Sequence, residues 1–279
     1  MNGRLRAEVF VLVRGIYTAA SGALVAQSMV DNVANNLANV NTSGFKQTLM
    51  QIQSAQTLNI YHLQTKPGQT PNRATPGVSS ATYVGPLGTG AQVYDTPENF
   101  SQGALQQTGN PLDLSLAGPN AFFAVQTPNG VRYTRDGQFL QDANGNLTTQ
   151  DGLSVLDAQG HQINLEPQGA GNQGAISIAS DGTISQQGRV IDRVAVVQFN
   201  NLTALRPEGD NRFVDTGQAG PSASTVGVQQ GSLEKSNGNV VRSMVDLITA
   251  ERWFDANERV IKNEDDATNL AISQVAKSQ

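Results

Sequence analysis

Apolar residues recur at helical spacing near both ends of the chain. In the N-terminal region two neighbouring series repeat every seven residues: Ile16, Ala23, Val30 and Leu37, and beside them Ala19, Ala26, Val33 and Val40. Two adjacent series make a broad apolar helix face, and its alanines allow a second helix to approach closely. The pattern predicts a helix over residues 16–41, about 39 Å long, with Gly44 as its C-terminal capping glycine.

The C-terminal region carries a matching pattern. One series repeats every seven residues and a second seam lies beside it: Val240, Leu247, Phe254 and Ile261, with Trp253, Ala256 and Val260. We expect Ser236 or Asn239 to cap this helix. Two interpretations stay open: a terminal hairpin packed on a core, or a coiled coil whose outer faces contact other subunits. The acidic run at residues 264–266 is either a solvated face or pairs with Arg or Lys of another subunit.

Asparagine is unusually frequent on the N-terminal helix. Five of the eleven residues from 31 to 41 are asparagine, although asparagine is a mediocre helix former. One helix face gathers four of them: Asn32, Asn35, Asn36 and Asn39. Val33, Leu37 and Val40 lie roughly 120° away. We therefore expect these three to pair with the C-terminal helix and the asparagines to face a neighbouring subunit, where amides can fix register without burying charge. The alternative is a solvated polar face.

A different composition follows the first helix. Between Lys46 and Asp95 the only charged residues are Lys66 and Arg73, and the stretch is rich in Gln, Thr, Pro and Gly. Such a sequence is typical of an extended or partly disordered connector. We expect it to become ordered on assembly.

Short β-prone runs and turn signals fill the region after the connector. "PLDLSLAG" alternates apolar and polar residues, and "AFFAVQ" and "RVAVVQF" are short apolar runs. Five dipeptides predict hairpin turns: Asn129-Gly130, Asp136-Gly137, Asn144-Gly145, Asp151-Gly152 and Asp181-Gly182.

These patterns together predict an α+β protein that is mainly β. The terminal helices, in residues 14–45 and 232–279, would pair as a coiled coil. Residues 46–95 would form the connector, and residues 96–230 a central, mostly antiparallel β domain.

Composition excludes several classes of protein. The net charge is −5 with no basic block, so the phosphate-neutralising patch of a nucleic-acid-binding protein is missing. There are no cysteines, which excludes disulfides and cysteine-ligated zinc. The apolar run at residues 9–13 is too short for a spanning helix. It is also too short for the apolar part of a signal peptide, although Arg4 and Arg6 precede it, so we expect no cleaved signal.

No convincing set of catalytic or metal-binding residues is present. His62 and His161 have no neighbouring triad or metal motif, and we interpret them as surface histidines. "DANGN" at Asp142 resembles the start of a calcium loop but lacks the later glycine and glutamate, which favours a hairpin turn. The glycine-rich stretches at Gly85 and Gly169 lack the lysine of a phosphate-binding loop. We therefore predict neither an enzyme nor a bound metal or cofactor.

Long stretches of the chain resemble one bacterial family. "RGIYTAASGALVAQSMVDNVANNLANVNTSGFKQ" (residues 14–47) is similar to the N-terminal signature of flagellar rod and hook proteins. "GSLEKSNGNVVRSMVDLITAERWFDANERVIK" (residues 231–262) is similar to the C-terminal signature. Residues 103–147 and 180–199 resemble the β domain of the rod subfamily, with a lean towards proximal rod proteins; distal rod proteins share nearly the same layout.

The resemblance implies a structural role in the flagellar basal body. Such proteins are exported unfolded through the flagellar type III export apparatus and assemble as a helical tube, the rod, which crosses the periplasm. Their terminal helices form the inner coiled-coil layer and their β domains lie outside it. The implied partners are further copies of the chain and other rod and hook axial proteins, with no nucleic acid and no small-molecule substrate.

Two departures from the family pattern stand out. Gly238 replaces a valine at the entry to the C-terminal helix, which is expected to loosen that entry. The usual family start corresponds to Val13, so we expect native protein to begin there.

Two other classes of protein compete with the rod interpretation. One is a β-rich extracellular binding or adhesive module with helical oligomerisation ends, and the other is a hydrolase with its site on the β domain. The rod interpretation predicts an assembly interface made by both helices: Asn32, Asn35, Asn36, Asn39, Val33, Leu37, Val40, Leu247, Trp253, Phe254 and Ile261.

Overall fold

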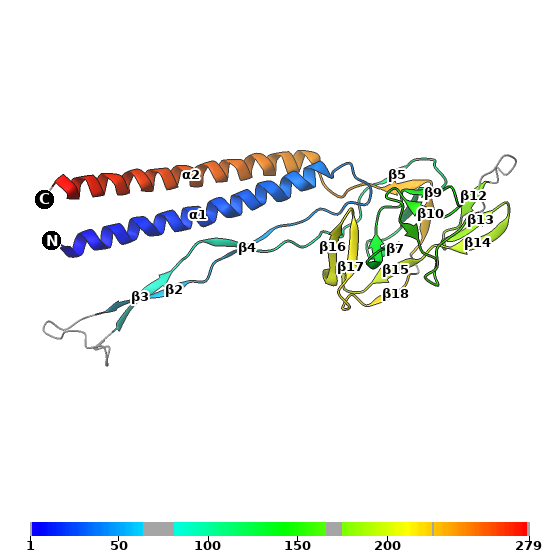
Figure 1. Ribbon diagram of the computed structural model, residues 1–279, viewed down its shortest axis with the longest axis horizontal. Coiled ribbons are helices and arrows are strands. Elements are labelled where there is room, and N and C mark those ends of the chain that lie inside the picture. Colours follow the sequence, from blue (N-terminus) through cyan, green and yellow to red (C-terminus); the bar gives the residue numbers. More distant parts are fainter. Residues whose placement is uncertain (1, 64–80, 166–174, 225, 278–279) are drawn as a thin grey trace. The chain divides into compact units, whose positions relative to one another are not determined.

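A computed structural model describes residues 2–63, 81–165, 175–224 and 226–277 (Figure 1). The chain forms two compact units. The first contains residues 1–33, 50–96 and 245–279, and the second contains residues 34–49 and 97–244. Residues 34–38, at the end of the first helix, and residues 240–244, at the start of the second, belong to the unit that carries most of the strands. Lys66 and Arg73 lie outside the described residues.

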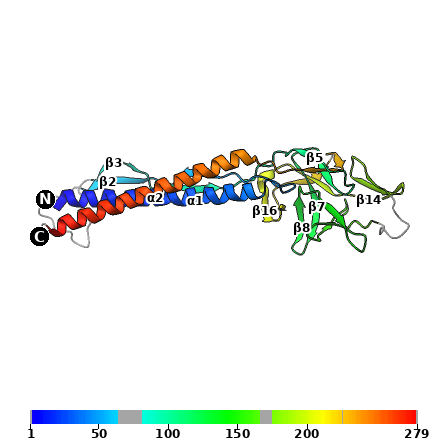
Figure 2. The ribbon, with the colours of Figure 1, turned by 90° about the horizontal axis from the view of Figure 1, so that it is seen from above.

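Two long helices form most of the first unit. Helix α1 spans Asn2–Ala38 and helix α2 spans Val240–Lys277. They run antiparallel, side by side (Figures 1 and 2). A Cβ atom added to Gly15 would lie 2.5 Å from Glu264 Oε1, and one added to Gly22 would lie 2.7 Å from Asn257 Oδ1. The predicted pairing of the terminal helices is therefore confirmed, and glycines on α1 make room for longer side chains on α2.

The predicted apolar face of α1 lies against α2. On α2, only some of the predicted apolar residues lie at this contact. Ala19, Ala26 and Val33 of α1 are buried. Three predicted residues of α2 are partly buried: Leu247, Phe254 and Ile261. The second series lies away from this contact and stays on the surface, because Trp253 is 50% exposed and Val260 is 44% exposed. Ala250, which is fully buried, and polar residues that fit against the small residues of α1 lie at the contact.

The capping predictions have different outcomes at the two helices. Asn239 caps α2, because its Oδ1 accepts the Arg242 N–H at 3.0 Å. Gly44 is not the C-cap of α1, which ends at Ala38. Gly44 has φ +68°, and a Cβ atom there would overlap the backbone at Arg135. Glycine is needed at this position both for its backbone conformation and for the close contact with the backbone at Arg135 in the same unit.

The described part of the connector forms antiparallel strand pairs in the first unit. Strand β1 (Gln51–Ser54) pairs with β4 (Ala91–Asp95), and β2 (Leu58–Leu63) pairs with β3 (Ala81–Leu87). The Ala91 N–H donates to Ser21 Oγ of α1 at 3.3 Å. The connector is therefore extended, as expected, and it is also paired.

The second unit is built around a nine-stranded antiparallel sheet. Seven strands follow one another in the order β16 (Leu205–Gly209), β17 (Arg212–Asp215), β8 (Gly130–Thr134), β7 (Ala121–Thr127), β11 (Ser154–Val155), β10 (Leu147–Thr149) and β9 (Phe139–Gln141). Strand β15 (Val196–Phe199) pairs with both β7 and β18 (Pro221–Ala223). The predicted antiparallel β domain is confirmed.

Smaller sheets and a short helix complete this unit. A three-stranded sheet joins β12 (Ile176–Ile178), β13 (Thr183–Gln186) and β14 (Arg189–Arg193). Two further pairs are β6 (Leu114–Leu116) with β19 (Val228–Gln230), and β5 (Leu105–Gln107) with β20 (Ser232–Glu234). A 3₁₀ helix spans Leu202–Ala204.

Strand β7 lies between two hydrophobic cores. Phe123 packs in one core, edge-to-face with Phe139 at 5.2 Å between ring centroids. Phe122 packs in the other core with Phe199 and Phe213. Because successive side chains of a strand point to opposite faces, the run "AFFAV" serves both cores.

Four of the five predicted hairpin turns are present. They connect β7 with β8, β9 with β10, β10 with β11, and β12 with β13. The prediction for Asp136-Gly137 is wrong, because β8 and β9 do not pair. Instead, a Cβ atom at Gly137 would overlap the Leu114 carbonyl oxygen, and the Leu114 N–H donates to the Gly137 carbonyl at 3.0 Å. This glycine therefore permits a close backbone contact between distant segments.

Candidate functional site

Three charged side chains meet in the interior of the second unit, and we call them the charge cluster. Lys46 follows the end of α1, Arg135 follows β8, and Glu234 ends β20 shortly before α2. Lys46 Nζ lies 2.6 Å from Glu234 Oε1, and Arg135 Nη1 lies 3.1 Å from Glu234 Oε2. Each residue is 2% exposed or less. One buried carboxylate therefore connects the segments that lead to the two helices with the β sheet.

Backbone groups satisfy much of the remaining hydrogen-bonding capacity of the charge cluster. Glu234 Oε1 accepts the Gly103 N–H at 2.8 Å, and Lys46 Nζ donates to the Ser101 carbonyl at 2.8 Å. Arg135 donates through Nη2 to the Gly118 carbonyl and lies over the ring of Phe122, 5.1 Å from its centroid. Among the described residues, Arg135 Nε has no hydrogen-bond partner. The cluster carries one negative and two positive charges away from water.

Burial dominates the electrostatics of the charge cluster. It lowers the pKa of Lys46 and the pKa of Arg135 from their usual values, and the attraction of Glu234 only partly opposes this effect. The desolvation of both cations thus outweighs their pairing. A buried pair of this kind adds little net stability compared with apolar packing, but removing one partner leaves an uncompensated charge. The cluster therefore fixes which segments meet.

Amide side chains extend this junction between segments. Asn237 Oδ1 accepts the Gln47 N–H at 2.8 Å, and its Nδ2 donates to the Asn99 carbonyl at 2.7 Å. The Gly44 N–H donates to the Glu234 carbonyl at 2.8 Å. The segment after α1, the segment after the connector and the segment before α2 are thus joined by hydrogen bonds within one unit.

The structure corrects the expectation for Asn36. Its side chain is 3% exposed and exchanges two hydrogen bonds with the backbone of Thr48, at 2.8 Å and 2.9 Å. This asparagine holds the segment around Thr48 against the end of α1, so its side chain is not available to a neighbouring subunit. Asn35 is exposed on the same helix.

Replacing Asn36 with leucine is accordingly expected to destabilise the monomer. The Thr48 N–H and carbonyl would lose their partners in a partly buried site, which costs about 2 kcal/mol in the free energy of unfolding. Urea denaturation followed by circular dichroism measures this loss. Asn35→Leu is the matched control on the exposed side, and equal stability of the two variants would contradict the assignment.

The other predicted interface residues have varied exposure. Val33 is buried, and Val40 lies near Gly238, where an added Cβ would be 3.8 Å from Val40 Cγ2. Six others are partly buried: Asn32, Asn39, Leu37, Leu247, Phe254 and Ile261. Apolar residues that the heptad patterns did not select are exposed on α2: Val241, Met244, Val245 and Ile248. Apolar surface therefore remains on the helix pair after the two helices have met.

The candidate catalytic and metal-binding positions have ordinary structural roles. His161 is exposed, with Nδ1 3.4 Å from Asp157 Oδ2, and His62 lies in β2. Asp142 closes the hairpin between β9 and β10 by accepting the Asn144 and Asn146 N–H groups at 2.8 Å and 2.7 Å. Within the described residues no group of three or more His, Asp or Glu side chains could hold a metal ion, and no helix is long and apolar enough to cross a membrane.

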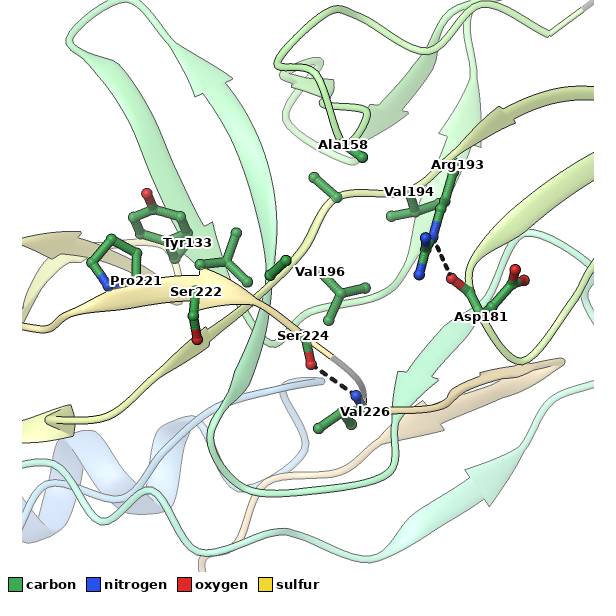
Figure 3. A pocket seen from close by; sticks show the side chains of 13 residues that line it. Tyr133, Ala158, Asp181, Arg193, Val194, Val196, Pro221, Ser222, Ser224 and Val226 are labelled. Atoms are coloured by element: carbon green, nitrogen blue, oxygen red, sulfur yellow. Dashed lines mark hydrogen bonds between the residues drawn. The ribbon is translucent and has the colours of Figure 1, made fainter.

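An open groove on the β unit gives no support to the hydrolase interpretation. It lies along β15 and β18, with Tyr133 near one end and Arg193 near the other (Figure 3). Its lining is mostly small and apolar, and Arg193 Nε donates to the Asp181 carbonyl at 2.8 Å. Asp181 supplies the only carboxylate among the lining residues, and no histidine is among them. A nucleophile with a neighbouring base is missing from this groove.

One carboxyl group near the charge cluster titrates close to neutral pH. Burial raises the pKa of Asp136 to about 6, and the nearby Asp151 and Asp113 add to the rise, whereas the Gln138 N–H opposes it. Because the folded-state pKa is above the unfolded value, the folded protein binds more protons between about pH 4 and pH 6 and loses stability as the pH rises through this window.

Asp136→Asn is therefore expected to stabilise the protein at pH 7 by about 1–2 kcal/mol and to flatten its pH dependence between pH 4 and pH 6. The amide oxygen can still accept the Gln138 N–H. Chemical denaturation at several pH values tests this. An unchanged slope of stability against pH in this window would contradict the role of Asp136.

The fold and the distribution of exposed residues indicate a class of protein. A chain whose terminal helices pair and still expose apolar side chains, and which carries a β unit without a catalytic set in its described residues, has the features of a structural subunit that associates through its ends.

Comparisons with known proteins identify the family. Residues 16–46 match the flagella basal body rod protein family, residues 118–186 match the flagellar hook protein FlgE/F/G D1 domain, and residues 229–273 match the C-terminal domain of the flagellar basal body rod FlgEFG proteins.

Curated relatives match along nearly the whole chain. Flagellar basal-body rod protein FlgF of Caulobacter vibrioides is 31% identical over 263 residues, which cover 94% of this chain and 98% of that protein. Flagellar basal-body rod protein FlgG of Bacillus subtilis is 31% identical over 268 residues, with 91% and 96% covered. Flagellar hook-basal body complex protein FlhP of Bacillus subtilis is 31% identical over 280 residues, with 94% and 99% covered. The chain belongs to the flagellar basal-body rod protein family, whose members are structural proteins and not enzymes.

Proposed function

We propose that this protein is a structural subunit of the flagellar rod that polymerises as a helical tube through its terminal helices. The observation that carries the proposal is the apolar surface left on the paired helices, where Trp253 and Val260 are about half exposed. Exposed apolar surface of this kind marks an interaction site. A single contact surface that meets a different surface on the next copy produces an open filament.

The proposed interface follows the exposed parts of both helices. It includes Asn35 on α1 and Trp253 on α2, together with the partly buried predicted residues that border them. Asn36 is excluded because its side chain binds Thr48. The partners are further copies of the chain and other rod and hook axial proteins.

The proposed route and location follow from family membership. The protein would leave the cytoplasm through the flagellar type III export apparatus and assemble in the part of the rod that crosses the periplasm. Helices that gain further burial from neighbouring subunits suit this route, because they become more stable on assembly than they are in the single chain.

A double substitution tests the role of the exposed apolar residues. Trp253→Gln with Val260→Gln is expected to leave the monomer folded and to raise the critical concentration for polymerisation about tenfold or more, because two apolar anchors are lost. Sedimentation measures assembly, and swimming of a bacterium that lacks its own copy of the gene measures function. Leu140→Gln with Val190→Gln, also exposed but on β9 and β14, is the matched control.

The same variants distinguish the adhesive alternative. A binding module would form a closed oligomer of fixed size, and the gene would not restore swimming. Open polymers of native protein that persist unchanged in the Trp253 and Val260 variant would contradict the proposed interface.

A further inference from the structure

Helix α2 carries two stripes of opposite charge with the same seven-residue period. The acidic stripe consists of Glu251, Glu258 and Asp265, and the basic stripe consists of Arg252 and Arg259. All five residues are exposed. Glu258 makes an ion pair with Lys262, at 2.8 Å on the helix surface, whereas neither arginine makes a salt bridge within the described part of the chain. Charged residues that only face water have no reason to repeat every seven residues, so the shared period indicates a contact surface.

The two stripes occupy different sides of the helix. Successive residues of an α-helix are about 100° apart, so each arginine lies about 100° from the acid that precedes it. Ala250 and Phe254 mark the side that lies against α1. With 100° between successive residues, the arginines lie on the side of α2 that faces away from α1. The acidic residues lie at the border of the contact with α1.

We propose, on the basis of the proposed function, that α2 of a second copy packs parallel to α2, with the basic stripe of one subunit facing the acidic stripe of the next. The stripes have the same period and opposite sign, so parallel copies bring them together over their whole length. Because each stripe meets the other and not itself, the contact is heterologous. After two subunits have paired, one still has a free acidic stripe and the other a free basic stripe. Further copies can therefore add at both ends by the same contact, which does not close.

The period also restricts the axial offset between neighbouring subunits. With no offset, Arg252 and Arg259 face Glu251 and Glu258, but Asp265 meets Asp266 of the neighbour. An offset of one heptad, about 10 Å along the axis, places the arginines opposite Glu258 and Asp265. This second arrangement avoids the contact between like charges, and it is the one that we infer.

Charge reversal followed by charge exchange tests the contact. Arg252→Glu with Arg259→Glu is expected to raise the critical concentration for polymerisation about tenfold or more, because each attraction becomes a repulsion. Adding Glu251→Arg, Glu258→Arg and Asp265→Arg to the same chain restores complementary stripes and is expected to bring the critical concentration back to within about threefold of native. Arg189→Glu with Arg206→Glu, exposed on β14 and β16, controls for the change in net charge.

Disulfide cross-linking tests the offset, and the chain suits it because it has no cysteine. Chains with Glu258→Cys and chains with Arg252→Cys are mixed, polymerised and oxidised. Dimers in this mixture, and none in either variant alone, are expected. Cross-linking of Glu251→Cys with Arg252→Cys chains instead would overturn the one-heptad offset.

Each outcome separates the contact from the proposed function. Native-like polymerisation of the Arg252 and Arg259 variant, or failure of the exchanged variant while its helix content by circular dichroism stays native, would overturn the stripe contact. If native protein neither polymerises nor restores swimming, the proposed function itself fails.

Discussion

Replacing Glu234 with glutamine is expected to lower the free energy of unfolding of the second unit by about 3–5 kcal/mol. The amide has nearly the shape of the carboxylate but no charge, so Lys46 and Arg135 would remain buried without a counter-ion. Urea denaturation followed by circular dichroism measures the loss.

Glu208→Gln is the matched control for this prediction. Glu208 pairs with Arg132 at the protein surface, where water screens the ion pair and its loss costs little stability. A second variant tests the cause: adding Lys46→Met to Glu234→Gln removes one of the two stranded cations and should recover part of the stability. Equal losses for Glu234→Gln and Glu208→Gln would contradict the importance of the charge cluster.

The sequence could predict those parts of the fold that depend on local periodicity. The alanines at positions 19 and 26 repeat on one side of α1, and that side is buried. Turn dipeptides such as Asn144-Gly145 connect neighbouring strands, because glycine permits the backbone that a tight hairpin requires. These features are determined by residues close to one another in the chain.

The inner face of α2 could not be predicted by the same rule. The apolar Trp253 and Val260 are half exposed, whereas the polar Asn257 and Glu264 lie against Gly22 and Gly15. A glycine on one helix leaves space for a longer polar side chain on the other, so side-chain size decided the contact there as much as hydrophobicity. The hydrophobic pattern of one helix gives no information about the size of the side chains on the helix that packs against it.

The charge cluster illustrates a second limit. Lys46 and Glu234 are 188 positions apart, and Arg135 is 99 positions from Glu234. No periodicity connects residues at such separations. The available signal was that Lys46 stands alone in a nearly uncharged stretch, "SGFKQ". A single charge in such surroundings indicates one half of a buried pair.

Gly44→Ala is expected to destabilise the second unit by more than about 3 kcal/mol. Two effects add: Gly44 has φ +68°, which costs an alanine about 1 kcal/mol, and the new methyl group would overlap the backbone at Arg135 and Asp136. Backbone atoms cannot rotate away as a flexible side chain can, so the segment after α1 must move. That movement would also break the hydrogen bond from the Gly44 N–H to the Glu234 carbonyl.

Gly188→Ala separates the two effects. Gly188 has nearly the same backbone conformation, φ +78°, but no atom lies within 4 Å of the position of an added Cβ. Its substitution should cost only the conformational strain, about 1 kcal/mol. The difference in the free energy of unfolding between the two variants, measured with urea, is therefore the cost of the overlap with the backbone at Arg135 and Asp136. If the two variants lose the same stability, the close contact at Gly44 contributes nothing beyond the strain of its backbone conformation.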